Sequence, residues 1–310
     1  MGTETVLVTG GAGFIGSALC RALVARGTRV VAYDNLRFGR SELLPDDPRC
    51  TFIQGDVRDA AAFRRVLHDA SPRAVCHLAA LHFIPYCNAH PEEAMDVNVN
   101  GTRQVLDACR LARPEILLFA STAAVYPAAD GPFREEDAPG PIDIYGTTKL
   151  MGEELARRFA VEAAVPTVIA RLFNAFGPRD TNPHLIPDVL AQLGEGDSVR
   201  LGNLEPVRDY VHLEDLASAL VTLLEGHHES CSVFNVGSGE GRSVREVLAA
   251  FEAAVGRPLS VVQDPGRVRK VERPRLVADT GKLRETGWRP QVGFQEGIRR
   301  LAADLRPAGN

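Results

Sequence analysis

The sequence has few aromatic residues and no long apolar run. Its 310 residues include one tryptophan and three methionines, and only 6% are aromatic. A helix needs about 18 consecutive apolar residues to span a bilayer, and no run without charges reaches that length. The opening residues, Met1–Glu4, lack the basic stretch of a secretory signal. We therefore expect a cytoplasmic protein with no membrane partner.

The sequence also lacks an excess of positive charge and any paired cysteine motif. The net charge is −5 and the pI is about 5.9. Because nucleic acids attract basic surfaces, this balance predicts no nucleic-acid partner. The six cysteines are scattered without a C-x-x-C pair, which favours reduced thiols and argues against a structural zinc site. No metal is expected.

Short β-branched runs alternate with helical runs through the first 120 residues. We expect strands over 4–9, 28–33, 50–53, 74–78 and 116–120, and helices over 14–26, 60–69 and 92–111. Such alternation predicts an α/β fold with a doubly wound parallel sheet, which binds ligands beyond the carboxyl ends of its strands. Gly and Pro cluster over 177–206, and the elements after them are less regular. We expect a first domain over 1–174 and a smaller α/β substrate-binding lobe over 175–310, some segments of which can return to the first domain.

A glycine-rich turn separates the first expected strand from the first helix. Gly10 permits a tight turn, Gly13 lets the backbone approach a pyrophosphate, and Gly16 lets the helix pack on the strand. Phe14 and Ile15 begin the helix, whose N-terminal N–H groups and dipole favour a phosphate. The order of strand, turn and helix predicts a dinucleotide site on a Rossmann-like sheet.

Asp34 lies at the end of the second expected strand, 18 residues after Gly16. A carboxylate at this position binds the adenosine ribose hydroxyls and repels a 2′-phosphate, which favours NAD over NADP. Arg37 and Arg40 follow closely and offer positive charge to such a phosphate. NADP therefore remains open as an alternative.

A tyrosine and a lysine four residues apart point to proton transfer. Tyr145 and Lys149 share one face if the segment is helical. An ammonium beside a phenol lowers the phenol pKa from about 10 toward neutrality, which would make Tyr145 a general base. Thr122 follows the strand expected over 116–120 and can share the same substrate hydroxyl.

Taken in order, these motifs resemble the extended short-chain dehydrogenase/reductase family. The segments include TGGAGFIG at residue 9, STAAVY at 121, YGTTK at 145, RLFNAFGPR at 171 and RDYVH at 208. The resemblance covers the chain from about residue 4 to residue 300. It is greatest to the branch of UDP-glucose 4-epimerase and related epimerases and dehydratases. It implies bound NAD, a nucleotide-diphosphate sugar as substrate, and a homodimer formed through helices near 92–111 and 146–160.

The resemblance also implies roles for individual residues. Thr122, Tyr145 and Lys149 match the catalytic set, and Tyr145 and Lys149 also contact the cofactor. Arg269 is one of four arginines within 267–275, so its match depends on the register. His82 stands where the family carries Lys or Ser. The remaining cofactor contacts are Asn35, Asp56, Val57, Leu78, Ala79, Ala80 and Asn98, and the remaining substrate contacts are Asn174, His184, Leu185, Arg208 and Arg269.

Two alanines decide between the reactions of the family. Sugar dehydratases carry acids directly after the catalytic Thr, whereas this sequence has Ala123 and Ala124. The resemblance then implies epimerisation at C4, in which Tyr145 takes the O4 proton while hydride moves from C4 to NAD, giving a transient 4-keto sugar. The stretch 264–288 is also similar to GDP-mannose-type enzymes, so a dehydratase or 4-ketoreductase stays open. A non-catalytic NAD(P)-sensing protein is the third alternative.

Overall fold

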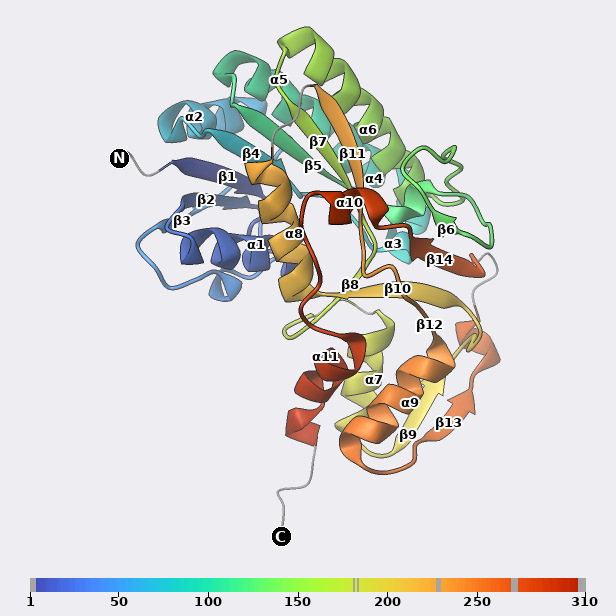
Figure 1. Ribbon diagram of the computed structural model, residues 1–310. Helices are drawn as coiled ribbons and strands as arrows, with labels where there is room; N and C mark the ends of the chain where they lie inside the picture. The colour runs from blue at the N-terminus through green and yellow to red at the C-terminus, as the bar shows by residue number, and fades with distance from the viewer. Residues whose placement is uncertain (1–3, 181, 183, 227–229, 269–272, 306–310) are drawn as a thin grey trace.

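A seven-stranded parallel sheet forms the centre of the first domain (Figure 1). The computed structural model describes residues 4–180, 182, 184–226, 230–268 and 273–305. The strand order β11-β7-β5-β4-β1-β2-β3 and the parallel pairing confirm the predicted α/β fold. The strands are β1 (Thr5–Thr9), β2 (Arg29–Asp34), β3 (Cys50–Gln54), β4 (Ala74–His77), β5 (Ile116–Thr122), β7 (Thr167–Leu172) and β11 (Cys231–Val236).

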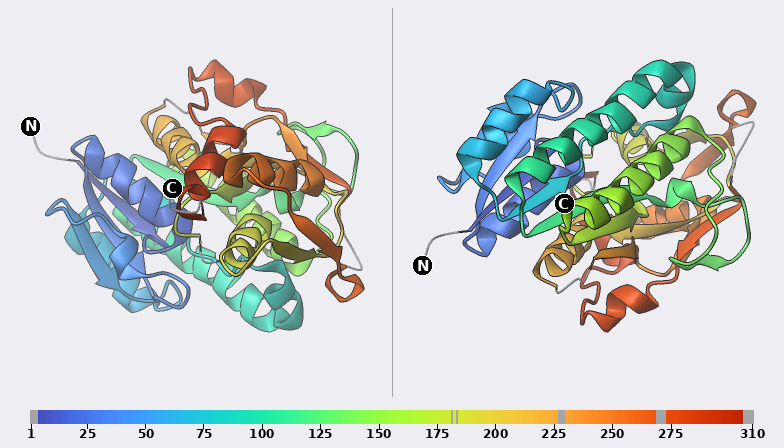
Figure 2. Two further views of the ribbon diagram at one scale, coloured as in Figure 1. Left: turned by 90° about the horizontal axis from the view of Figure 1, so that it is seen from below. Right: turned by 90° about the horizontal axis from the view of Figure 1, so that it is seen from above.

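Helices cover both faces of this sheet because successive strand residues point to opposite sides. Val6 and Val8 face α1 (Phe14–Ala25) and α8 (Leu213–Glu225), whereas Leu7 faces the other layer. That second layer consists of α2 (Ala60–Ala70), α5 (Thr102–Ala112) and α6 (Ile144–Ala163), which lie in a row in Figure 2. The central strands β4, β5 and β7 are therefore buried on both faces, as their apolar runs predict, whereas the edge strand β3 is partly exposed.

The predicted helix over 92–111 is interrupted. It consists of α4 (Pro91–Met95), a π-helical stretch over Asp96–Gly101, and α5. Directly after the stretch, the hydroxyl of Thr102 donates to the Asn98 carbonyl at 2.6 Å and lies 2.9 Å from His77 Nε2. The stretch thus turns buried polar side chains of one helix toward the end of β4.

The second lobe is built on an irregular sheet and a small satellite core. Its main sheet contains β12 (Gly241–Ser243), β10 (Val207–His212), β14 (Arg275–Ala278), β6 (Pro132–Phe133) and, paired with β10, β8 (Asn174–Phe176). Strands β9 (Ser198–Leu201) and β13 (Ser260–Gln263) form a separate pair near α7 (Leu185–Leu193), α9 (Val244–Val255) and α11 (Phe294–Leu301). The shorter elements are α3 (Ile84–Ala89), α10 (Gly281–Glu285) and 3-10 turns at Ser41–Leu43, Ala123–Val125, Pro265–Arg267 and Ala303–Leu305.

The two parts exchange segments. Strand β11 lies beyond residue 174 but pairs with β7 in the first sheet, and α8 packs on α1. In the opposite direction, β6 pairs with β14 in the second lobe. Each part is therefore completed by chain from the other.

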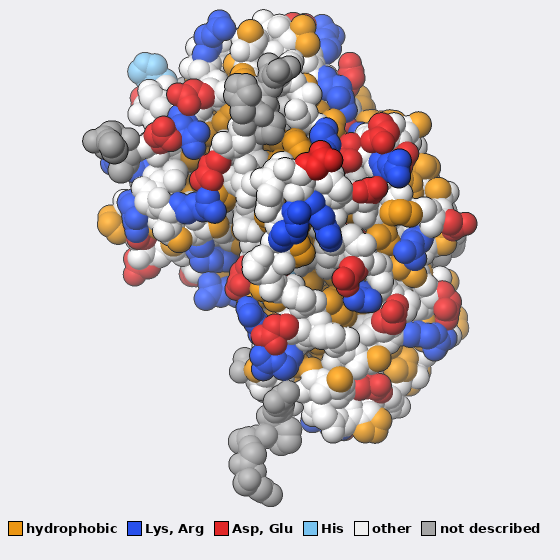
Figure 3. Space-filling model, in the orientation of Figure 1, with side chains coloured by type: hydrophobic (Ala, Val, Ile, Leu, Met, Phe, Trp, Pro, Cys, Tyr) orange, Lys and Arg blue, Asp and Glu red, His pale blue; other side chains and the backbone are white. Residues whose placement is uncertain are grey.

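The described surface carries mixed charge. Lys and Arg side chains lie among Asp and Glu side chains over the face shown in Figure 3. Within the described ranges, no helix has the length and apolarity to cross a membrane, and no group of three or more His, Cys, Asp or Glu is placed to hold a metal. All six cysteines are free thiols.

Candidate active site

A cavity of about 1000 Å³ lies between the carboxyl ends of the parallel strands and the second lobe. Because β1 has β2 on one side and β4 on the other, the chain changes winding direction there and leaves a crevice. Arg269 falls outside the described residues. Of the other predicted site residues, those in the cavity wall are Gly10, Gly13, Phe14, Ile15, Gly16, Asp34, Asn35, Asp56, Val57, Leu78, Ala79, Ala80, Thr122, Tyr145, Lys149, Asn174, His184, Leu185 and Arg208.

Asn98 lies behind this wall. It is 1% exposed, and its amide accepts from the Leu81 N–H at 2.7 Å and donates to the Leu81 carbonyl at 2.9 Å. It also donates to Thr148 Oγ1 on α6 at 2.9 Å. Asn98 therefore fixes the loop that follows β4, and its cofactor contact stays a prediction.

The glycine turn has the geometry of a phosphate cradle. Gly10 has a φ of 69°, and a Cβ there would stand 2.8 Å from the Ala79 nitrogen. A Cβ at Gly16 would stand 2.0 Å from the Gly10 carbonyl oxygen. Gly13 caps α1 without a side-chain hydrogen bond, so the N-terminal N–H groups of that 12-residue helix face the cavity. These features fit a pyrophosphate.

Asp34 fixes the turn at the end of β2. Its carboxylate accepts hydrogen bonds from the Ala12 N–H at 3.1 Å and the Leu36 N–H at 2.8 Å. Burial raises the pKa of Asp34, and the two N–H donors partly offset this. The carboxylate thereby reaches the cavity from a rigid position, as a ribose contact requires.

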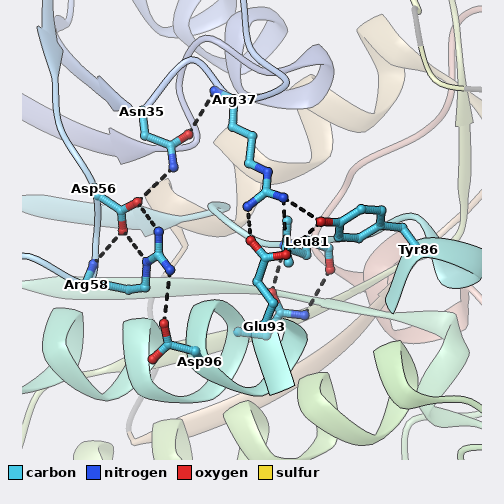
Figure 4. A network of polar contacts seen from close by, with 9 residues as sticks. Asn35, Arg37, Asp56, Arg58, Leu81, Tyr86, Glu93 and Asp96 are labelled. Atoms are coloured by element: carbon cyan, nitrogen blue, oxygen red, sulfur yellow. Dashed lines mark hydrogen bonds and ion pairs between the residues drawn. The ribbon is translucent and has the colours of Figure 1, made fainter. Parts of the chain in front are cut away.

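Asp56 and Asn35 continue the wall beside Asp34 (Figure 4). The Asn35 amide donates to Asp56 at 3.0 Å, and the Arg58 guanidinium donates to both Asp56 oxygens at 2.9 and 2.8 Å. This guanidinium holds the pKa of Asp56 well below its usual range. Asp56 is therefore a paired carboxylate at neutral pH.

Thr122, Tyr145 and Lys149 converge on one part of the cavity. Thr122 ends β5 and Tyr145 lies near the start of α6, and both line the cavity. Lys149 is 2% exposed, with Nζ 4.3 Å from the centre of the Phe119 ring. The structure therefore brings Thr122 of the strand end and Tyr145 and Lys149 of the helix to one cavity.

The predicted direction of the Tyr145 pKa is wrong for the protein alone. Burial raises the pKa of Tyr145, and the nearby Thr122 hydroxyl lowers it only in part. Burial also lowers the pKa of Lys149 to about 7, so its ammonium is only partly charged at neutral pH. The sequence shows the pairing of the two residues but not how deeply both are desolvated.

A buried ion pair supports Lys149 from the next turn of α6. Glu153 is 1% exposed, lies 2.8 Å from Arg171 Nη2 of β7, and accepts from Ser121 Oγ at 2.6 Å. Its charge raises the pKa of Lys149, against the larger effect of burial. The network ties α6 to β5 and β7, beneath the catalytic residues.

Arg273 links the second lobe to the start of α6. Its guanidinium donates to Asp143 Oδ2 at 3.0 Å, to the Ala124 carbonyl at 2.7 Å and to the Tyr126 carbonyl at 3.0 Å. Asp143 is the N-cap of α6 and accepts from the Gly146 N–H at 2.7 Å. Arg208 Nη1 in turn donates to the Arg273 carbonyl at 2.9 Å. Neither Asp143 nor Arg273 is among the predicted site residues, although an Asp three residues before Gly146 is an N-cap signal.

His82 lines the cavity close to a segment of the second lobe. Its Nε2 lies 3.0 Å from Asn182 Oδ1, and its ring centre lies 5.8 Å from that of His184. Burial lowers the pKa of His82 to about 4, so its imidazole is neutral at pH 7. The neighbouring polar side chains Tyr86 and Cys87 lie outside the cavity wall; the Cys87 thiol donates to the Leu81 carbonyl.

The chain matches a known family over most of its length. The model of the NAD dependent epimerase/dehydratase family covers residues 6–237. The chain belongs to this family. The family resemblance predicted from the motifs is confirmed, and the matched segment contains the glycine turn, Thr122, Tyr145 and Lys149.

Relatives within the family include epimerases of known structure. UDP-glucose 4-epimerase of Rhizobium meliloti strain 1021 is 34% identical over 314 residues, covering 94% of each chain. The crystal structure of Thermus thermophilus UDP-glucose 4-epimerase in complex with NAD is 34% identical, with a TM-score of 0.90 and coverage of 99% of this chain and 100% of that chain. The Thermotoga maritima UDP-glucose 4-epimerase with UDP-glucose is 29% identical, with a TM-score of 0.90 and coverage of 97% and 98%.

Proposed function

We propose that this protein is an NAD-dependent epimerase that inverts C4 of a nucleotide-diphosphate sugar. The observation that carries the proposal is the grouping of Thr122, Tyr145 and Lys149 in the same cavity as the glycine turn. The relatives named above support it, because they are UDP-glucose 4-epimerases that align with nearly the whole chain. UDP-sugars are accordingly the first substrates to test.

The cavity wall fits a dinucleotide. The N-terminus of α1 and the turn at Gly10 and Gly13 would hold the pyrophosphate, and Asp34 the adenosine ribose. NAD, when bound, accepts hydride from the sugar carbon and returns it. The enzyme's own groups must therefore move only the hydroxyl proton and orient the sugar.

Tyr145 is the group that would accept the O4 proton. Thr122 lines the same cavity and would orient the sugar hydroxyl toward the phenol. Lys149 lies in the same wall and stabilises the phenolate whenever its ammonium is charged. Because burial raises the pKa of the free phenol, deprotonation depends on positive charge near Tyr145.

The residues after Thr122 favour epimerisation over dehydration. Ala123 and Ala124 are 3% and 5% exposed and carry no group that can transfer a proton. Removing water from the sugar needs proton-transferring side chains near C5 and C6, and these two positions supply none. A dehydratase or 4-ketoreductase is therefore only the second candidate.

Arg208 and Asn174 line the second-lobe side of the cavity, where Arg208 would bind the substrate diphosphate.

The test is product analysis without added reductant. The purified protein is incubated with NAD and a panel of UDP-, dTDP- and GDP-sugars, and the products are examined by mass spectrometry and proton NMR. We expect an unchanged mass with an inverted C4 signal. Loss of one water would indicate a dehydratase, and no conversion of any sugar would refute the proposed activity. A 4-ketoreductase would also leave these sugars unchanged here, and it would instead consume NADH in the presence of a 4-keto sugar nucleotide.

We also propose a homodimer formed through α5 and α6. These helices lie side by side on one face of the molecule (Figure 2), and Leu111, Met151 and Val161 are exposed there. Light scattering on the native protein and on Val161→Asp tests the dimer, which the added charge should dissociate.

The six free thiols support the proposal that the protein works in a reducing compartment, the cytoplasm.

A further inference from the structure

Arg37 lies in the cavity wall, three residues after the Asp34 that we propose binds the adenosine ribose. It follows Asp34 in the loop after β2 and lines the cavity together with Asn35 and Asp56. Arg40, the other arginine of this loop, is exposed and outside the cavity wall. Arg37 is thus the arginine of the loop that has access to the adenosine end of the site.

The guanidinium of Arg37 is held by Tyr86 and Glu93, two residues that lie outside the cavity wall (Figure 4). It forms an ion pair with Glu93 of α4, with Nη2 3.2 Å from Oε2, and Nη2 also donates to the Tyr86 hydroxyl of α3 at 2.6 Å. The Tyr86 hydroxyl itself lies 2.7 Å from Glu93 Oε2. The guanidinium also lies 5.5 Å from the centre of the Tyr86 ring. Arg37, Tyr86 and Glu93 therefore form a closed three-residue cluster.

The carboxylates at this end of the cavity outnumber the guanidiniums that pair with them, so the net charge there is negative. Arg58 is held by Asp56 and by Asp96 at 3.0 Å, as Arg37 is held by Glu93. These two guanidiniums pair with the carboxylates of Asp56, Glu93 and Asp96 (Figure 4), and Asp34 adds a fourth carboxylate in the cavity wall. A phosphate dianion here would be repelled by the carboxylates, and both guanidiniums would already be paired. Ribose hydroxyls, in contrast, can donate to Asp34.

We propose that Glu93, assisted by Tyr86, is a cofactor-specificity residue that keeps Arg37 from binding a 2′-phosphate. The inference rests on the dinucleotide site assigned under the proposed function. Asp34 discriminates by repelling the phosphate directly, whereas Glu93 acts by withdrawing the cation that would accept it. Removing the Glu93 charge leaves Arg37 in the wall beside Asp34, free to pair with the phosphate.

The test is competitive exchange of the cofactor, read without any turnover. Wild-type protein and variants are equilibrated with equal concentrations of NAD and NADP, and the bound nucleotide is extracted and identified by mass spectrometry. Glu93→Gln should raise the bound NADP:NAD ratio about tenfold, the usual effect of one charge-assisted hydrogen bond. Tyr86→Phe should raise it less, because the ion pair remains.

Three controls separate this role from a structural one. Glu92→Gln removes a neighbouring carboxylate in the same first turn of α4 and should leave the ratio unchanged. Arg40→Ala should also leave it unchanged. The double variant Glu93→Gln/Arg37→Ala should return the ratio to the wild-type value or below.

The outcomes distinguish the inference from the assignment of the site. An unchanged ratio in Glu93→Gln, or a raised ratio that persists when Arg37 is also removed, would overturn the role of Glu93 while leaving the NAD site intact. If wild-type protein bound neither nucleotide, the dinucleotide site itself would be refuted and the inference with it.

Discussion

Gly146 approaches Ala124 so closely that a Cβ at position 146 would stand 2.3 Å from the Ala124 carbonyl oxygen. This contact joins the start of α6 to the turn that follows Thr122. It sets the distance between the element that carries Tyr145 and the strand end that carries Thr122. The placement of these two side chains in one cavity therefore depends on the absence of a side chain at position 146.

We expect Gly146→Ala to separate Thr122 from Tyr145 and to lower turnover. The methyl group must displace backbone, since its nearest neighbour is a carbonyl oxygen. Such overpacking costs about 1–3 kcal/mol of stability, which thermal unfolding would report alongside the rate. Gly131→Ala is the control, because a Cβ at Gly131 has nothing within 4 Å. Equal effects from both substitutions would contradict the close-contact argument.

Tyr145→Phe should lower the rate of epimerisation by about 10²–10⁴-fold, the usual contribution of a general acid–base group. The ring and its packing remain, so the protein should fold and should retain NAD. NMR of the sugar product measures the rate, and extraction of the bound nucleotide checks the site. A variant that keeps near-native turnover would show that another group moves the O4 proton.

Lys149→Met should stabilise the fold most at low pH. Burial lowers the pKa of Lys149 to about 7, compared with about 10.4 in an unfolded chain. Below pH 7 the lysine is charged in both states, so the cost of burying its charge counts fully against folding. Between pH 7 and about 10.4 the folded protein binds fewer protons than the unfolded chain, and this cost declines as the pH rises.

The measurement for Lys149→Met is the difference in melting temperature from wild type at several pH values, with the cofactor removed. The variant should melt higher at pH 6, and the difference should shrink toward pH 10. Each unit of pKa shift corresponds to about 1.4 kcal/mol, so the effect at pH 6 amounts to a few kcal/mol. A difference that does not change with pH would show that Lys149 is hydrated in solution.

Arg273→Met should destabilise the protein more than the double variant Arg273→Met/Asp143→Asn. The two side chains are 6% and 7% exposed and 3.0 Å apart. Removing only the arginine leaves a buried carboxylate unpaired, which costs about 3–5 kcal/mol. Asn keeps the helix N-cap without the charge. Urea unfolding of the single and double variants measures the coupling, and strictly additive effects would contradict it.

The sequence predicts the first domain well because its signals are local. Apolar runs such as 5–9 and 116–122 are buried on both faces, and the glycine turn must stand between β1 and α1. The parallel sheet then brings residues at the strand ends together, so Asp34, Asp56 and Thr122 could be assigned to one cavity from their order alone.

Other features depend on partners distant in sequence and could not be read from it. Arg273 contacts Asp143 and Ala124 across more than a hundred residues, and Arg37 finds Glu93 through the packing of α4. The direction of the Tyr145 pKa also depends on burial by surrounding elements. Residue types show which groups can ionise, whereas packing decides how strongly each is desolvated.

The pairing of β11 with β7 has a consequence for synthesis on the ribosome. The chain emerges from its N-terminus, so β7 is complete long before residues 231–236 have been translated. During that interval the outer edge of β7 offers open backbone groups, which are prone to pair with other strands. A nascent chain ending at residue 174 thus contains nearly all the residues of the proposed dinucleotide site, but its sheet still lacks strand β11. Completion of the cofactor domain has to wait until much of the substrate lobe has been made.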